Sequence, residues 1–244
     1  MKGVVLAGGL GTRLHPLTKV TNKHLLPVYM KPMIYYPIEA LVSGGIEEIM
    51  IVTGGNNAGD FLKLLGNGKE FGLAHLNYTY QEGEGGIAEA LSLCRAFVDG
   101  DKVAVVLGDN ILQNSIKQHV DAYKEQETGA RVLLKEVEDP ERFGVARLEG
   151  ERITEIIEKP DDPPSSYAVT GIYFYDHQVW NVIDSLNPSD RNELEITDVN
   201  NFYVKQDTMQ YSVLEGWWTD AGTFESLKRA SDLVAETGAN NREQ

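Results

Sequence analysis

The distribution of apolar and polar residues divides the chain into short strand-like and helix-like segments that alternate along the sequence. Residues 2–7 read KGVVLA, a nearly continuous apolar run of the kind found in parallel strands that are covered on both faces. Similar runs follow it, separated by segments with helical periodicity and glycine-rich turns. Up to residue 107 the pattern predicts strands at 2–7, 48–53, 74–80 and 102–107, and helices at 32–43, 58–65 and 87–98.

This alternation predicts the fold class. Strands that alternate with helices form a parallel sheet with right-handed crossover connections. We therefore expect an α/β protein, a Rossmann-like three-layer sandwich with a mostly parallel central sheet. Ligands of such sheets bind at the carboxyl ends of the strands, so the loops after residues 7, 80 and 107 are expected at one edge.

The second half of the chain has a more mixed pattern. Two apolar segments around Glu149-Gly150 predict a β-hairpin. No repeat or shift in composition marks a second domain, so we expect one domain over 1–244, with halves at 1–112 and 113–236 and a flexible polar tail at 237–244. The predicted elements are strands at 130–137, 143–148, 152–157, 167–175 and 209–214, and helices at 194–205 and 224–236.

Composition excludes several classes of protein. The formal net charge of −15 argues against nucleic-acid binding, which needs a basic stripe, but small anionic ligands need only local positive charge. The single cysteine, Cys94, excludes an intramolecular disulfide framework and lies at an apolar helical position, where we expect a core thiol. No apolar run is long enough for a membrane span or a signal-peptide core. We expect a cytoplasmic protein with no nucleic-acid or membrane partner.

Residues 3–14, GVVLAGGLGTRL, form the strongest local signal for a binding site. The apolar run stops at glycines, whose backbone N–H groups can surround phosphate oxygens, and Arg13 adds a fork of donors. A simple turn between a strand and a helix is the ordinary alternative. The segment is not a P-loop, and the dinucleotide fingerprint that begins at Gly9 and Gly11 meets Leu14 where its third glycine belongs.

Further polar residues follow other predicted strands. Gln81 can both donate and accept, as recognition of the O4 and N3–H groups of thymine or uracil requires, although a loop glutamine is often merely solvated. Asp109 and Asp220 suit Mg²⁺, or are turn or N-cap residues. Glu158 and Lys159 could share a sugar-phosphate ligand if the strand ends before Pro160, since neighbouring strand residues point to opposite faces. A surface ion pair is the ordinary alternative.

Taken in order, these segments resemble the motifs of the sugar nucleotidyltransferase family. GGLGTRL followed by Lys23 in TNKHLLPV matches its first pair of motifs, and LGDN and WWTDAGT match its pair of metal-binding motifs. QEGEGGIAEA matches its base-binding stretch, with Glu84 in place of the usual proline and Ile87 in place of leucine. RNELEITD matches an arginine motif, with Asn192 in place of the usual glycine. Over residues 3–223 the ordered set is most similar to the glucose-1-phosphate thymidylyltransferases.

The resemblance implies a nucleotide-diphospho-sugar transferase fold and a role for each matched residue. It implies charge stabilisation by Arg13, Lys23, Lys159 and Arg191, and a Mg²⁺ site at Asp109 and Asp220. It implies nucleotide binding by Leu6, Gly8, Gly9, Gly11, Thr12, Arg13, Lys23, Gln81 and Gly86. It implies sugar-phosphate binding by Asn110, Gly144, Glu158, Lys159, Val169, Tyr173 and Arg191.

The implied reaction joins dTTP and α-D-glucose 1-phosphate to give dTDP-glucose and pyrophosphate, as the first step of dTDP-L-rhamnose or related deoxysugar synthesis, by a homo-oligomer (tetramer or dimer). Three alternatives remain: a uridylyltransferase on the same sugar phosphate, a non-catalytic regulatory paralogue that binds sugar nucleotides, and a dehydrogenase. Joint presence of Arg13, Lys23 and the two aspartates argues against the second. Leu14 and the lack of a ribose-binding acid argue against the third.

Overall fold

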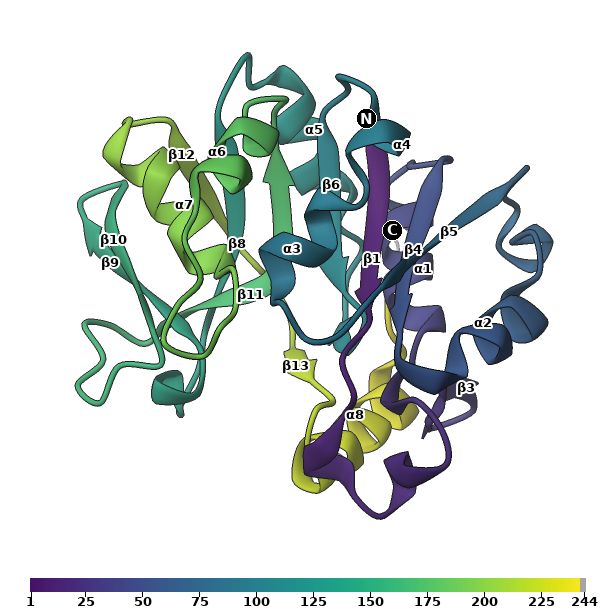
Figure 1. Cartoon of the computed structure of the whole chain (residues 1–244). Coiled ribbons are helices and arrows are strands. Elements are labelled where there is room, and N and C mark those ends of the chain that lie inside the picture. The colour runs from purple at the N-terminus through teal and green to yellow at the C-terminus, as the bar shows by residue number, and fades with distance from the viewer. Residues whose placement is uncertain (242–244) are drawn as a thin grey trace.

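The first predicted strand is an inner strand of a nine-stranded sheet. In the computed structural model, which describes residues 1–241, β1 (Lys2–Ala7) lies between β4 (Ile49–Gly54) and β6 (Val103–Leu107) and runs parallel to both (Figure 1). β5 (Leu76–Gln81) extends the parallel region beyond β4. The apolar side chains of β1 are buried on both faces of the sheet, as its sequence pattern predicts.

Helices cover both faces of this sheet. On one face α1 (Tyr35–Ser43), α2 (Ala58–Leu65) and α5 (Lys117–Glu125) contribute to one apolar core. A second core forms on the other face with residues from four helices. These are α3 (Ile87–Ser92), α4 (Arg95–Val98), α6 (Val179–Ser185) and α7 (Ile196–Lys205). The predicted α/β class and three-layer architecture are confirmed.

The second half of the chain adds mainly antiparallel strands to the same sheet. β11 (Tyr167–Tyr175) pairs antiparallel with β6 and β8 (Ala130–Glu136), and with the hairpin strand β9 (Gly144–Glu149). The predicted hairpin is confirmed, since β9 pairs antiparallel with β10 (Arg152–Glu158). β12 (Met209–Val213) pairs parallel with β8.

Three helical predictions differ from the structure. The first helix begins only at Tyr35, because Lys31–Pro32 forms a strand, β3, that pairs with β2 (Pro27–Val28). The predicted helix at 87–98 divides into α3 and α4, where the Cys94 N–H donates to the Leu91 carbonyl and tightens the turn. The sequence pattern did not predict α6, a short helix whose buried residues include Trp180.

A small separate sheet links the two halves of the chain. β7 (Asn110–Leu112) pairs antiparallel with β13 (Trp218–Asp220), and neither strand was predicted. β13 leads into α8 (Phe224–Thr237), which starts with a capping box between Thr223 and Ser226. Asp220 is thereby fixed opposite Asn110, although the two are far apart in sequence.

The described end of the predicted flexible tail contacts the rest of the fold. The Asn240 and Asn241 N–H groups donate to the carbonyls of Leu112 and Gln113, at 3.0 and 2.8 Å. The Asn240 side chain also donates to the Tyr36 carbonyl. These bonds place both asparagines against the end of β7. Residues 242–244 of that tail lie outside the described residues.

None of the helices within residues 1–241 combines the length and the apolar character that crossing a membrane requires.

Candidate active site

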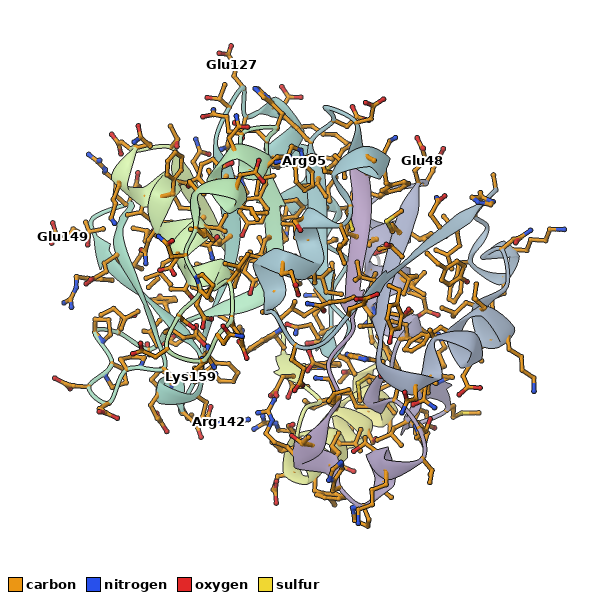
Figure 2. All side chains as sticks on the ribbon, in the orientation of Figure 1. Glu48, Arg95, Glu127, Arg142, Glu149 and Lys159 are labelled. Atoms are coloured by element: carbon orange, nitrogen blue, oxygen red, sulfur yellow. The ribbon has the colours of Figure 1, made fainter. Side chains whose placement is uncertain are left out.

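A cleft of about 830 Å³ opens at the carboxyl ends of the parallel strands. Its wall contains residues from both halves of the chain, and every site residue predicted from the sequence lines it. In Figure 2, Arg142 and Lys159 lie on the lower side of the molecule, the side toward which β1 runs from the N-terminus. The lining includes Leu6, Gly8, Gly9, Gly11, Thr12, Arg13, Lys23, Gln81, Gly86, Asp109, Asn110, Gly144, Glu158, Lys159, Val169, Tyr173, Arg191 and Asp220.

The glycine loop after β1 forms one wall of the cleft. Gly11 has a φ of 67°, a left-handed conformation, and a Cβ there would lie 2.8 Å from the Cβ of Lys23. The following turn, Thr12–Leu14, buries the Leu14 side chain completely and leaves Arg13 exposed at the cleft. Leu14, which breaks the dinucleotide fingerprint, therefore anchors the loop, and Arg13 is free to meet a ligand.

Lys23 and Asp109 form a nearly buried ion pair on the floor of the cleft. The Lys23 Nζ lies 2.6 Å from the Asp109 Oδ2. Burial alone would raise the pKa of Asp109, but the Lys23 charge, His24 and the hydrogen bond from Lys23 hold it well below its ordinary value. Burial and the Lys23 charge together lower the pKa of His24 to about 3, so this histidine is neutral near pH 7. Its Nδ1 lies 2.7 Å from the Asn22 Oδ1.

The two predicted metal ligands converge near Gly222. A Cβ on that glycine would lie 3.0 Å from the Asp220 Oδ2, 3.4 Å from the Asp109 Oδ2 and 2.9 Å from an Arg13 nitrogen. Burial raises the pKa of Asp220, and the nearby Asp109 carboxylate raises it further. Two carboxylates that face each other in this way fit a Mg²⁺ ion. Because residues 1–241 contain no group of three or more metal-binding side chains, its other ligands would come from phosphates or water.

Gln81 ends β5 with its side chain buried at the edge of the cleft. Its Nε2 donates to the Gly86 carbonyl at 3.1 Å and to the Glu89 carboxylate at 2.6 Å. A Cβ on Gly8 would lie 2.7 Å from its Oε1, so the oxygen faces the glycine loop. Both N–H donors of this amide are thus used inside the protein, and its oxygen is the group that the amide presents toward the glycine loop.

The strand β10 ends where the sequence suggested. Lys159 has a φ of 44°, which turns the chain, and its Nζ lies 3.2 Å from the Glu158 Oε1. Both side chains therefore lie on the same side and can reach one ligand. Thr197 on α7 donates to the other Glu158 oxygen at 2.8 Å. Gly144 lies opposite Glu158 in the hairpin and leaves space beside this carboxylate.

Arg191 lies in the loop before α7 with its guanidinium near the Glu195 carboxylate. Its Nη2 lies 2.8 Å from the Glu195 Oε2, and its Nε donates to the other oxygen at 3.2 Å. Asn192 has a φ of 59°, the conformation for which glycine is best suited and which asparagine tolerates. The substitution of the usual glycine therefore keeps the backbone turn.

Arg142 is a basic residue of the cleft that the motifs did not identify. It lines the cleft from the turn before β9, and its guanidinium lies 2.6 Å from the Asp139 carboxylate and 3.5 Å from the Asp220 Oδ1. Its only signal in the sequence is a basic residue directly before the FGVA segment. The cleft thus places five basic side chains, Arg13, Lys23, Arg142, Lys159 and Arg191, among its carboxylates, and local positive charge of this kind suits phosphorylated ligands.

The chain matches the family described as nucleotidyl transferase over residues 2–237. It is 43% identical to a glucose-1-phosphate thymidylyltransferase of Neisseria meningitidis, over 96% of this chain and 82% of that protein. A relative of the same name from Mycobacterium tuberculosis is 40% identical, with the same coverage.

Two solved structures are similar to the fold over most of both chains. One, from Bacillus anthracis, is assigned as a glucose-1-phosphate thymidylyltransferase and contains sucrose. Its sequence is 53% identical to this chain, the match covers 97% of this chain and 96% of that chain, and the TM-score is 0.93. The other is a UDP-glucose pyrophosphorylase in complex with UDP-glucose, 27% identical, with coverage of 96% and 98% and a TM-score of 0.84.

Proposed function

The chain belongs to the nucleotidyl transferase family, and on that basis we propose that it transfers a thymidylyl group from dTTP to α-D-glucose 1-phosphate, with release of dTDP-glucose and pyrophosphate. The observation that supports this most is one cleft that has the glycine loop and Arg13 on one wall and Lys159 and Arg191 on the other. The Asp109 and Asp220 pair lies beside Arg13. Relatives more than 40% identical carry the name of this reaction.

The main task of the site is to bring two polyanions together. An oxygen of the sugar phosphate forms a bond to the α-phosphorus of dTTP, while the bond from that phosphorus to the pyrophosphate oxygen breaks. Arg13 and the glycine-loop N–H groups would stabilise the charge that develops on the departing pyrophosphate, and Lys23 would contact the nucleotide phosphates. No general base is needed, because the attacking phosphate is already ionised at neutral pH.

Two ion pairs would have to open when the substrates bind. Lys23 pairs with Asp109, and Arg191 pairs with Glu195. A phosphate that takes either cation must compete with the carboxylate that holds it. We propose that Asp109 is then compensated by Mg²⁺, held with Asp220, which when bound would shield phosphate charge and align the two substrates.

The sugar end of the cleft presents polar and apolar contacts in fixed positions. Glu158, held by Thr197, would accept hydrogen bonds from sugar hydroxyls, and Lys159 would bind the phosphate. The Asn110 Oδ1 already accepts hydrogen bonds from the Gly171 N–H and the Trp218 indole N–H. Gly144, Val169 and Tyr173 line the remaining surface around the sugar.

A uridylyltransferase is the second candidate. The similarity to a UDP-glucose pyrophosphorylase structure supports it, and the base contact expected of Gln81 is common to thymine and uracil. The lower identity of that structure, 27% against 53%, favours the thymidylyl donor. We also propose a role in dTDP-L-rhamnose or related deoxysugar synthesis, and assembly as a dimer or tetramer.

The test is release of pyrophosphate from dTTP, UTP, dCTP and ATP, each with a panel of hexose 1-phosphates, with and without Mg²⁺. We expect the highest kcat/KM for dTTP with glucose 1-phosphate, and no measurable rate after chelation of Mg²⁺. A higher kcat/KM for UTP would favour the second candidate. Binding of sugar nucleotides without release from any pair would show a binding protein instead.

A further inference from the structure

The amide group of Gln81 has no free hydrogen for a ligand. A side-chain amide has two N–H donors, and those of Gln81 go to the Gly86 carbonyl and to the Glu89 carboxylate. Among the hydrogen bonds of residues 1–241, its Oε1 accepts none. That oxygen faces Gly8, across the part of the cleft expected to hold the nucleotide.

Glu89 and the Gly86 carbonyl both oppose the turned orientation of the amide, and Glu89 is the closer and the charged one of these two acceptors. An ionised carboxylate can only accept hydrogen bonds. If the Gln81 amide turned over, its Oε1 would take the position 2.6 Å from the Glu89 Oε2, and two acceptors would face each other. Glu89 is half-buried, and it lies behind Gln81 rather than in the lining of the cleft.

The Glu89 carboxylate lies directly against Gly85. A Cβ on Gly85 would overlap this carboxylate, so a side chain there would displace it from its contact with Gln81. The main chain of Gln81 is held in turn by its pairing with Gly54 in the sheet. The two interacting side chains therefore start from fixed main-chain positions on β5 and α3.

We propose that Glu89 is a positioning residue that selects the base of the nucleotide by fixing the Gln81 amide with its oxygen toward the ligand. This inference rests on the proposed nucleotidyl transfer. A fixed acceptor suits the N3–H donor of thymine or uracil. It disfavours cytosine, whose N3 is itself an acceptor. Base selection would then depend on a charged residue that does not touch the base.

The decisive variant is Glu89→Gln, which keeps the size of the side chain but can donate as well as accept. The Gln81 amide can then turn over, so we expect the Kd and KM for dTTP to rise about tenfold, and the preference for dTTP over dCTP to fall about tenfold, while kcat changes less than about twofold. Binding is measured by calorimetry with each nucleotide alone. The kinetic constants come from pyrophosphate release.

Two further variants separate positioning from a general effect. Glu82→Gln removes the same charge from the loop between β5 and α3, at an exposed position outside the cleft, and should leave the preference unchanged. Gln81→Glu should weaken dTTP binding by placing two carboxylates together. The double variant Gln81→Glu with Glu89→Gln should recover part of that loss, because the pair is reversed and an acceptor still faces the base.

The outcomes distinguish this inference from the proposed function. If the unaltered protein binds no pyrimidine nucleotide, the proposed function is wrong and the role of Glu89 falls with it. If the unaltered protein prefers dTTP to dCTP, and Glu89→Gln has the same preference as Glu82→Gln, the proposed function stands and the role given to Glu89 is overturned.

Discussion

The two halves of the cleft hold their functional side chains in different ways. In the first half, Gly8, Gln81 and Asp109 lie at or directly after the ends of parallel strands β1, β5 and β6. In the second half, Glu158 comes from an antiparallel hairpin and Arg191 from a loop. Parallel strands bring their carboxyl ends to one edge without further specification. The second wall depends instead on pairings between distant segments.

The charges are also arranged differently. Asp109 in the first half has a close, nearly buried partner in Lys23. Asp220 in the second half has a longer contact with Arg142 at 3.5 Å and a hydrogen bond from the Gly222 N–H at 3.3 Å, and the nearby Asp109 carries a charge of the same sign. The Asp109 carboxylate is therefore held by its own ion pair with Lys23. The position of Asp220 depends instead on the backbone pairing of β7 with β13.

The largest effect on kcat is expected from a substitution in the glycine-loop wall of the cleft. Arg13→Ala should lower kcat by on the order of 10²–10³-fold, as loss of a charge-stabilising donor does. Lys19→Ala removes an exposed charge nearby that does not line the cleft, and should leave kcat unchanged. Rates of pyrophosphate release decide the matter. Comparable rates for the two variants would remove Arg13 from the site.

Replacement of Asp109 and replacement of Asp220 should have different effects on the stability of the protein. Asp109→Asn leaves the Lys23 charge without its carboxylate, so the free energy of unfolding of the metal-free protein should fall by about 3 kcal/mol. Asp220→Asn removes a repulsive charge and should cause no loss. Urea denaturation without metal measures both. Both variants should need more Mg²⁺ for half-maximal activity, and an equal stability loss in both would contradict the difference between the halves.

A substitution of Arg142 in the second wall should have a smaller effect on catalysis. Arg142→Ala should lower kcat/KM for glucose 1-phosphate about tenfold, because it removes the cation beside Asp220. Arg147→Ala is the matched control, since Arg147 pairs with Glu155 outside the cleft. Steady-state kinetics at saturating nucleotide would show the effect, and equal values for both variants would exclude a role for Arg142.

The smallest effect is expected in the core beneath both walls. Burial raises the pKa of the Cys94 thiol to about 12, so this group should react with a thiol reagent only after unfolding. Cys94→Ala should lower the free energy of unfolding by about 1 kcal/mol and leave kcat unchanged. Rapid labelling of the native protein, or a loss of activity in the variant, would show that the thiol is not a purely structural group.

Much of the site could be predicted from local sequence because its residues lie close to strand ends. The glycine loop, Gln81 and Asp109 each lie within a few residues of an apolar run that the pattern places correctly. The end of β10 at Glu158 followed from Pro160 in the same way. Asn192 shows the limit of this approach, since its left-handed conformation appears only in the structure.

The sequence by itself determined the α/β class and the motif residues of the cleft, because strand pattern, glycine turns and motif chemistry are local properties. Only the tertiary structure decided which of these groups meet. The β7–β13 pairing brings Asp220 to Asp109, and Glu89 turns the amide of Gln81. Such contacts join residues on separate elements, and their geometry depends on how strands and helices pack, which no local pattern specifies.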